Sequence, residues 1–268
     1  GGVVATFECG RYTPMGERRP TGFLDDILGV RGKGVPRSSM ASDESGYKQV
    51  YMDITSDHPI LEGVAFTSVL PMGGDYRPVE AADAEIPLTL SAPFVVFPEG
   101  FSYPKTEPLG DPLMVAREPE SGGRTVYFAG QVGRLFWNVR YPDHGRLIAD
   151  AVRWARDEGL PVQVDAPRSL QISLRKQPGR LMVHMINLSG GDRFFSELVP
   201  ARDIRVRLSR EAWDGAVPDA WLLGGERFPI AVDDAWWEVT VPSVKDYEVL
   251  VFSVREEDLS RSSSSGEI

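Results

Sequence analysis

The sequence has one cysteine, three histidines and no long apolar run, and each shortage excludes a class of protein. A single cysteine, Cys9, cannot form an internal disulfide, so a disulfide scaffold and a cysteine-based zinc site are both excluded. The three histidines are too few and too scattered to predict a metal site. No apolar stretch approaches the ~20 residues that a membrane-spanning helix needs, so no membrane partner is predicted.

Basic residues are also in deficit, because 29 Lys and Arg face 39 Asp and Glu for a formal net charge of −10. This balance argues against a nucleic-acid partner, which would require a basic face. The hydrophobic fraction of 42% is ordinary for a globular chain. No cofactor is predicted. The compartment stays open, although a lone cysteine fits a reducing cytoplasm slightly better.

The first residues predict a buried strand. Residues 3–7 form a continuous apolar run after a glycine pair, which is typical of a parallel strand covered on both faces. A parallel strand needs partner strands on both sides. We therefore expect further strands before Gly1, and we interpret the chain as the C-terminal part of a larger protein whose catalytic machinery lies elsewhere.

The remaining pattern predicts an α/β domain followed by an all-β domain. A short helix is expected after Thr21, ending at Gly29, then a mobile loop over residues 31–46, several strands to residue 129, and a helix over residues 143–158. From residue 162 onward, about eight short strands separated by Gly, Pro and Asp turns predict an antiparallel β-sandwich. The expected domains are residues 1–159 and 160–254, and residues 255–268 are predicted to be a disordered tail.

Several stretches agree in order and spacing with a known family. They are residues 1–8, 11–12, 22–30, 123–130, 135–137, 142–147, 151–155, 180–188, 241–242 and 246–249. The stretches up to residue 155 resemble the glutamine-amidotransferase-like domain of certain glycoside hydrolases, called the β-galactosidase trimerisation domain. The later stretches are similar to the C-terminal β-domain of the same enzymes.

The resemblance implies a fold and an assembly role. It implies a partial flavodoxin-like domain, incomplete at its N-terminus, before the sandwich. In these enzymes a TIM barrel comes first and holds the two catalytic carboxylates, and the amidotransferase-like domain commonly builds the oligomer. A homo-oligomer, as a trimer or dimer, and contact with carbohydrate through the parent enzyme are therefore the implied partners.

Cys9 is the one candidate for catalysis. True class I amidotransferases place a nucleophilic cysteine in a sharp turn after a strand and activate it with a histidine. Cys9 follows a strand, but the residues after it lead into a loop, and no histidine follows the strand expected over residues 126–131. An inert, partly buried thiol is the alternative interpretation.

Adjacent carboxylates are the other pattern that could indicate catalysis, because glycoside hydrolysis uses a pair of them. The groups Asp25–Asp26, Asp233–Asp234 and Glu256–Asp258 diverge in direction, so all three are interpreted as solvated faces and turns. No acidic residue is predicted to be catalytic.

Aromatic and polar side chains near the strand ends are the interface or ligand candidates. Trp236 and Trp237 are adjacent on a strand, so one of them points outward and could hold a sugar or anchor a partner, whereas Trp213 and Trp221 are expected in the core. The candidates are Arg11, Tyr12, Phe136, Trp137, Tyr141, His144 and Trp237.

Three functions are therefore carried forward. The favoured one is a non-catalytic assembly and support module of a carbohydrate-active glycoside hydrolase with a β-galactosidase-like parent. The alternatives are a carbohydrate-binding module that uses exposed tryptophans and a Cys9-dependent amidotransferase-like hydrolase.

Overall fold

The computed structural model describes residues 1–43, 46–103, 109–120, 122–156, 159–191, 197–213 and 218–253, without the side chains of residues 41–47. The chain forms two compact units, Gly1–Gly159 and Leu160–Ile268, each with its own hydrophobic core. The predicted tail over residues 255–268 lies outside the described residues. No helix within the described residues is long and apolar enough to cross a membrane.

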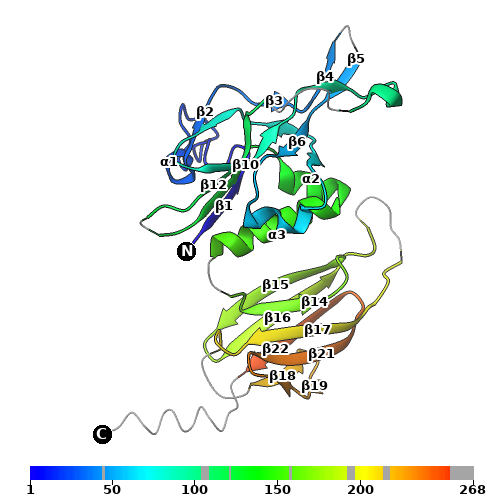
Figure 1. Cartoon of the computed structure of the whole chain (residues 1–268). Helices are drawn as coiled ribbons and strands as arrows, with labels where there is room; N and C mark the ends of the chain where they lie inside the picture. Colours follow the sequence, from blue (N-terminus) through cyan, green and yellow to red (C-terminus); the bar gives the residue numbers. More distant parts are fainter. Residues whose placement is uncertain are drawn as a thin grey trace. The chain divides into compact units, whose positions relative to one another are not determined.

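A six-stranded sheet forms the centre of the first unit, in the order β1-β13-β12-β10-β6-β7 (Figure 1). Its strands are β1 (Val3–Thr6), β6 (Tyr51–Ile54), β7 (Val69–Pro71), β10 (Glu85–Leu90), β12 (Pro112–Arg117) and β13 (Thr125–Phe128). Only the β1–β13 pair is parallel, and the other neighbours run antiparallel. The flavodoxin-like assignment therefore stays a prediction.

The first strand differs from its prediction. Within the described residues β1 pairs only with β13, so it lies at an edge of the sheet. Val3 is 37% exposed and Val4 is half-buried, whereas the neighbouring β13 is buried at every residue. The apolar run thus marked a strand correctly but overestimated its burial, because the strand is not enclosed by partners on both sides.

One long helix packs on this sheet. Helix α3 (Pro142–Arg156) has Pro142 at its first position, where the missing N–H costs no hydrogen bond. Asp143 in its first turn and the arginines in its last turn suit the helix dipole. Its buried residues include Leu147, Ala151 and Ala155, which lie four residues apart and so share one face. The predicted helix is confirmed as far as residue 156. The 3₁₀ helix η1 (Pro59–Val64) packs beside α3.

Two shorter helices differ from expectation. Helix α1 (Asp25–Leu28) is a single turn that ends at Gly29, whose φ of 66° permits the left-handed cap. Its N-cap is Leu24 without a side-chain hydrogen bond, so the predicted Thr21 cap is wrong. Helix α2 (Val132–Val139) had not been predicted.

Residues 31–46 are not the predicted loop, because the described part of this segment is mostly strand. The strands in and next to this segment are β2 (Val30–Gly32), β3 (Arg37–Ser38), β4 (Met40–Asp43) and β5 (Gly46–Gln49). Their partners from later in the chain are β8 (Asp75–Tyr76), β9 (Val79–Ala81) and β11 (Phe94–Val95). They form the small sheets β2-β9, β3-β8 and β11-β5-β4. The β4–β5 hairpin projects from the unit (Figure 1). Backbone pairing with distant strands orders a segment that looks polar and glycine-rich locally.

The second unit consists of two antiparallel sheets around one core, which confirms the antiparallel sheets predicted after residue 162. One sheet has the order β14-β17-β21-β20 and the other β15-β16-β22-β18-β19. The strands are β14 (Val162–Asp165), β15 (Leu170–Gln177), β16 (Arg180–Asn187), β17 (Ala201–Ser209), β18 (Asp219–Leu222), β19 (Arg227–Phe228), β20 (Ala231–Val232), β21 (Trp236–Val244) and β22 (Tyr247–Ser253). Alternate residues enter the core, as in a β-sandwich.

Candidate functional site

A sharp turn follows β1 at the carboxyl end of the parallel pair. Phe7 has a φ of 52°, a left-handed conformation that is uncommon for a large side chain. Its N–H donates to the Phe128 carbonyl at 2.7 Å, and its own carbonyl accepts from the Tyr127 hydroxyl at 2.5 Å. Contacts on both sides of the peptide thus hold Phe7 in this turn. The carboxyl ends of parallel strands are where α/β folds place ligands.

Cys9 lies two residues after this turn and does not occupy its strained position. Its side chain is exposed. All three histidine rings contact other groups: His58 accepts from the Ile60 N–H at 3.2 Å, His144 bonds the Pro71 carbonyl at 2.8 Å, and His184 bonds the Tyr247 hydroxyl at 2.7 Å. Cys9 therefore resembles an accessible surface thiol more than an activated nucleophile, and it is less buried than expected.

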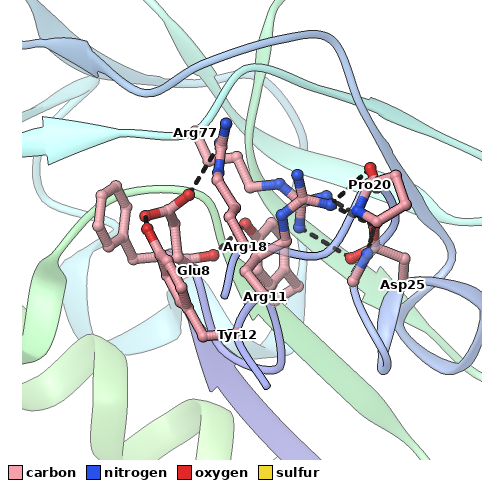
Figure 2. Close-up of polar contacts among 10 residues, drawn as sticks. Glu8, Arg11, Tyr12, Arg18, Pro20, Asp25 and Arg77 are labelled. Carbon is pink, nitrogen blue, oxygen red and sulfur yellow. Dashed lines mark hydrogen bonds and ion pairs between the residues drawn. The ribbon is translucent and has the colours of Figure 1, made fainter. Parts of the chain in front are cut away.

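A buried ion pair (Figure 2) lies next to Tyr127, the residue whose hydroxyl bonds the Phe7 carbonyl. Arg77 is fully buried and Asp25 is 1% exposed. The guanidinium donates twice to the carboxylate, from Nη1 to Oδ1 at 2.8 Å and from Nη2 to Oδ2 at 2.6 Å. The Gly22 N–H also donates to Asp25 Oδ2 at 2.8 Å. The pair joins residues 52 positions apart and fastens α1 to the segment between β8 and β9.

Arg11 adds a second cation to this buried group. It is 5% exposed, its Nη1 donates to the Pro20 carbonyl at 3.0 Å, and the same atom lies 3.9 Å from Asp25 Oδ2. Two guanidinium groups thus share one carboxylate, so this buried group carries a net positive charge. The predicted ligand candidate Arg11 points inward and supports the turn rather than facing a ligand.

These contacts perturb the titration of two side chains. Burial by itself raises the pKa of Asp25, but the hydrogen bonds from Arg77 and Gly22 and the nearby positive charges outweigh it, and the net pKa is lowered. Burial raises the pKa of Tyr127 to about 12, against the opposing effect of Arg77. Asp25 is therefore ionised and Tyr127 is neutral at physiological pH.

A more exposed group is drawn beside the buried one in Figure 2. Glu8 accepts from the Tyr12 hydroxyl at its Oε2 and from Arg18 Nη2 at its Oε1, both at 2.9 Å. Tyr12 is 47% exposed, and its hydrogen bond to Glu8 raises its pKa. This group can exchange hydrogen bonds with a polar ligand or a partner surface, and its one carboxylate, Glu8, is already paired with two donors.

A second set of predicted residues lies on α2 and at the start of α3. Trp137 is 52% exposed, and the guanidinium carbon of Arg140 lies 4.3 Å from its ring centroid. Phe136 is half-buried, and its ring lies where a side chain on Gly145 would clash. Tyr141 is half-buried with its ring 5.2 Å from that of His144, which is itself buried. Within this set Trp137 offers the most accessible surface.

Trp237 is a wrong candidate. It is 3% exposed in the core of the second unit, where its ring meets Trp213 edge-on at 6.3 Å. Its neighbour Trp236 is the outward residue, with Arg207 over its ring at 5.7 Å. Trp221, expected in the core, instead pairs with Val251 on the outer face of the five-stranded sheet. Strand alternation predicts that one of two neighbours is buried, but the side that faces the core depends on register.

Sequence reasoning missed the central ion pair. Asp25 was interpreted as solvated, and that interpretation is wrong. Arg77 lies far from it in the sequence and carries no local signal, so only the pairing of β8 and β9 with distant strands brings the two charges together. Among the described residues, no three His, Cys, Asp or Glu side chains gather in a way that could hold a metal ion.

Comparisons with known proteins identify neighbours of the fold. No family model and no curated protein matches the chain. An α-L-fucosidase isoenzyme 2 from Paenibacillus thiaminolyticus matches over 96% of this chain and 37% of its own, with a TM-score of 0.60 and 16% identity. A β-galactosidase from Bacillus circulans sp. alkalophilus matches over 94% of this chain and 29% of its own, with a TM-score of 0.51 and 15% identity.

These matches relate the fold to that of glycoside hydrolases. The identities are low, so the likeness is one of fold. The chain spans about a third of the length of each of the two enzymes. Both units take part, because nearly the whole chain is covered.

Proposed function

We propose that this chain is a non-catalytic assembly and support module of a carbohydrate-active glycoside hydrolase with a β-galactosidase-like parent. The observation that carries the proposal is the structural match, which takes in nearly all of this chain but about a third of an α-L-fucosidase and of a β-galactosidase. A segment that recurs within two such enzymes fits an accessory role beside a separate catalytic domain. The trimerisation-domain resemblance of the first unit points the same way.

The surface of the first unit supports an assembly role. Several of its large aromatic side chains are exposed: Phe23 72%, Phe66 70%, Phe97 78% and Trp137 52%. Aromatic residues are enriched at protein interfaces and supply much of their binding energy. Trp137 is additionally held in place by Arg140, so its ring is ordered before a partner arrives. The proposed partner is a second copy of the chain, in a dimer or trimer.

Sedimentation velocity across a concentration series tests this proposal. We expect a species of two or three times the 29.6 kDa chain mass. Trp137→Ala is expected to shift the distribution toward the monomer by weakening association about tenfold or more. Trp236→Ala serves as the matched control, because it removes a partly exposed tryptophan from the second unit. A monomer at every attainable concentration would contradict the assembly role.

Carbohydrate binding is a second candidate function, favoured by one observation. Trp237 cannot contribute because it is buried, but Trp221 lies on the outer face of a sheet. The Cys9-dependent hydrolase gains no comparable support, because Cys9 lies beyond the strained turn and the histidine rings contact other groups.

A further inference from the structure

The outer face of the five-stranded sheet contains two unexpectedly buried valines. On β22, Leu250 and Phe252 enter the core, so Val249 and Val251 face the other side. Yet Val249 is 3% exposed and Val251 is 2% exposed. Within the described residues, their register neighbours are side chains on the adjoining strands β16 and β18.

The strand register identifies these neighbours. Val251 lies between Met182 on β16 and Trp221 on β18. The Trp221 Nε1–H donates to Ser253 Oγ at 3.3 Å, and Ser253 is two residues further along β22. The indole therefore leans from β18 toward Ser253 on β22, beside the register position of Val251. Trp221 is half-buried there, so part of its surface is accessible on the outer face of the sheet.

A second pair of rings lies further along the same strand. Tyr247 is 47% exposed, and its hydroxyl lies 2.7 Å from His184 Nδ1. The two rings are nearly parallel, with an interplanar angle of 29° and centroids 6.1 Å apart. Val251 and Tyr247 are four residues apart on an extended strand, or about 13 Å. The aromatic side chains are therefore far enough apart to contact different units of a ligand made of several linked rings, rather than a ligand with one ring.

Polar groups of both signs border these rings. On β15, Ser173 pairs with His184 and Arg175 pairs with Met182, so both lie on this face. On the other side, Arg227 pairs with Trp221, and its Nη1 lies 3.5 Å from the Asp219 carboxylate. Hydroxyl, carboxylate and guanidinium groups thus flank an apolar strip, which provides hydrogen-bond donors and acceptors within reach of anything stacked on it.

We propose that this face of the second unit binds a neutral oligosaccharide through Trp221 and Tyr247. Sugar rings are apolar on their C–H faces and carry hydroxyl groups around their edges, so they match flat rings bordered by donors and acceptors. Mixed flanking charges favour a neutral ligand, and the net charge of −10 disfavours nucleic acid. The inference rests on the proposed carbohydrate-active context and adds a site that this context does not supply.

Affinity gel electrophoresis of the full chain tests the site. Native gels containing galactan, arabinogalactan, xyloglucan or glucomannan provide the probes, and fragments of any retarding polysaccharide are then titrated by calorimetry. We expect at least one of these polysaccharides to retard the chain. Trp221→Ala should weaken binding about tenfold or more, whereas Trp236→Ala, on the opposite sheet, should leave it unchanged. Tyr247→Phe, which keeps the ring, should bind better than Tyr247→Ala.

Several outcomes would overturn the proposal. The first is migration that no polysaccharide alters. The second is equal affinity of Trp221→Ala and the unsubstituted chain for the polysaccharide. The third is a loss of affinity in Trp236→Ala as large as that in Trp221→Ala. If Trp221→Ala lowers the melting temperature strongly, the comparison of Tyr247→Phe with Tyr247→Ala decides instead. Sedimentation of the same samples separates this question from assembly, because retardation by a monomer would reject the assembly role alone. A Trp221→Ala variant that lowers the mass without altering retardation would assign this face to a second copy and reject the sugar site.

Discussion

The buried Asp25–Arg77 pair makes a quantitative prediction about the stability of the first unit. Asp25→Asn removes the negative charge while keeping the size of the side chain. Arg77 is fully buried and makes both of its carboxylate contacts with Asp25. The substitution therefore leaves a buried guanidinium beside a second one, Arg11, with no carboxylate between them.

The expected cost follows from this burial. Removing one partner of a buried ion pair costs about 3–5 kcal/mol, because the remaining charge is left uncompensated away from water. An exposed pair for comparison is supplied within the same chain by Asp165 and Arg205, whose side chains are 63% and 56% exposed. Solvent screens such a pair, so Asp165→Asn should change the free energy of unfolding far less than Asp25→Asn.

Urea denaturation combined with hydrogen-exchange mass spectrometry measures both effects. Peptides from each unit report that unit's own free energy of unfolding, so the second unit serves as an internal reference for Asp25→Asn. In the double variant Asp25→Asn with Arg77→Met, the loss in free energy of unfolding should be roughly 1–3 kcal/mol smaller than the sum of the losses in the two single variants. If Asp25→Asn costs no more than Asp165→Asn, the assignment of a stabilising buried charge pair is wrong.

Further predictions concern titration, reactivity and the second unit. Burial lowers the pKa of His58 and His144 in the folded protein. As the pH falls through the ordinary histidine range, the unfolded state therefore binds more protons than the folded state. The free energy of unfolding of the first unit should thus be full above that range and should decrease on acidification from about pH 7 to about pH 5. His144→Gln should flatten this dependence in denaturation curves, whereas an unchanged pH profile would exclude His144 as a contributor. Cys9 is exposed and should be labelled completely by a thiol reagent in the folded protein, and a thiol that reacts only after unfolding would contradict the placement of that turn. Asn187 donates to the carbonyls of Val199 and Lys245, both at 2.8 Å. Asn187→Ala should therefore destabilise the second unit by about 1–3 kcal/mol in urea denaturation. A loss of stability confined to the first unit would count against this prediction.

Local pattern was sufficient for the elements whose cause is local. The apolar spacing of Leu147, Ala151 and Ala155 predicted helix α3, because residues four apart share a helix face whatever surrounds them. Alternating residues and turn signals predicted the antiparallel strands after residue 162 for the same reason. Gly29 ended its helix as predicted, because glycine has no Cβ and adopts the positive φ of a helix C-cap without steric cost.

Features that depend on distant partners could not be predicted in this way. The segment over residues 31–46 reads as a loop because it is rich in Gly, Ser and Arg. Its strands β2 and β3, and the following strand β5, pair with strands between residues 75 and 95, whereas β4 pairs locally with β5. The choice between Trp236 and Trp237 needed the register of β17 against β21, because a shift of one residue exchanges the two faces.

Local sequence pattern was enough to predict helix α3, the helix end at Gly29 and the antiparallel strands after residue 162, and composition gave the acidic charge and the shortage of cysteine and histidine. Tertiary structure alone decided that Asp25 meets Arg77 across 52 residues and that Trp221 and Tyr247 come to one face of a sheet. The physical reason is that helices and turns are set by neighbours within a few residues, whereas buried charge pairs and surface sites are built by strands that pair over long distances along the chain.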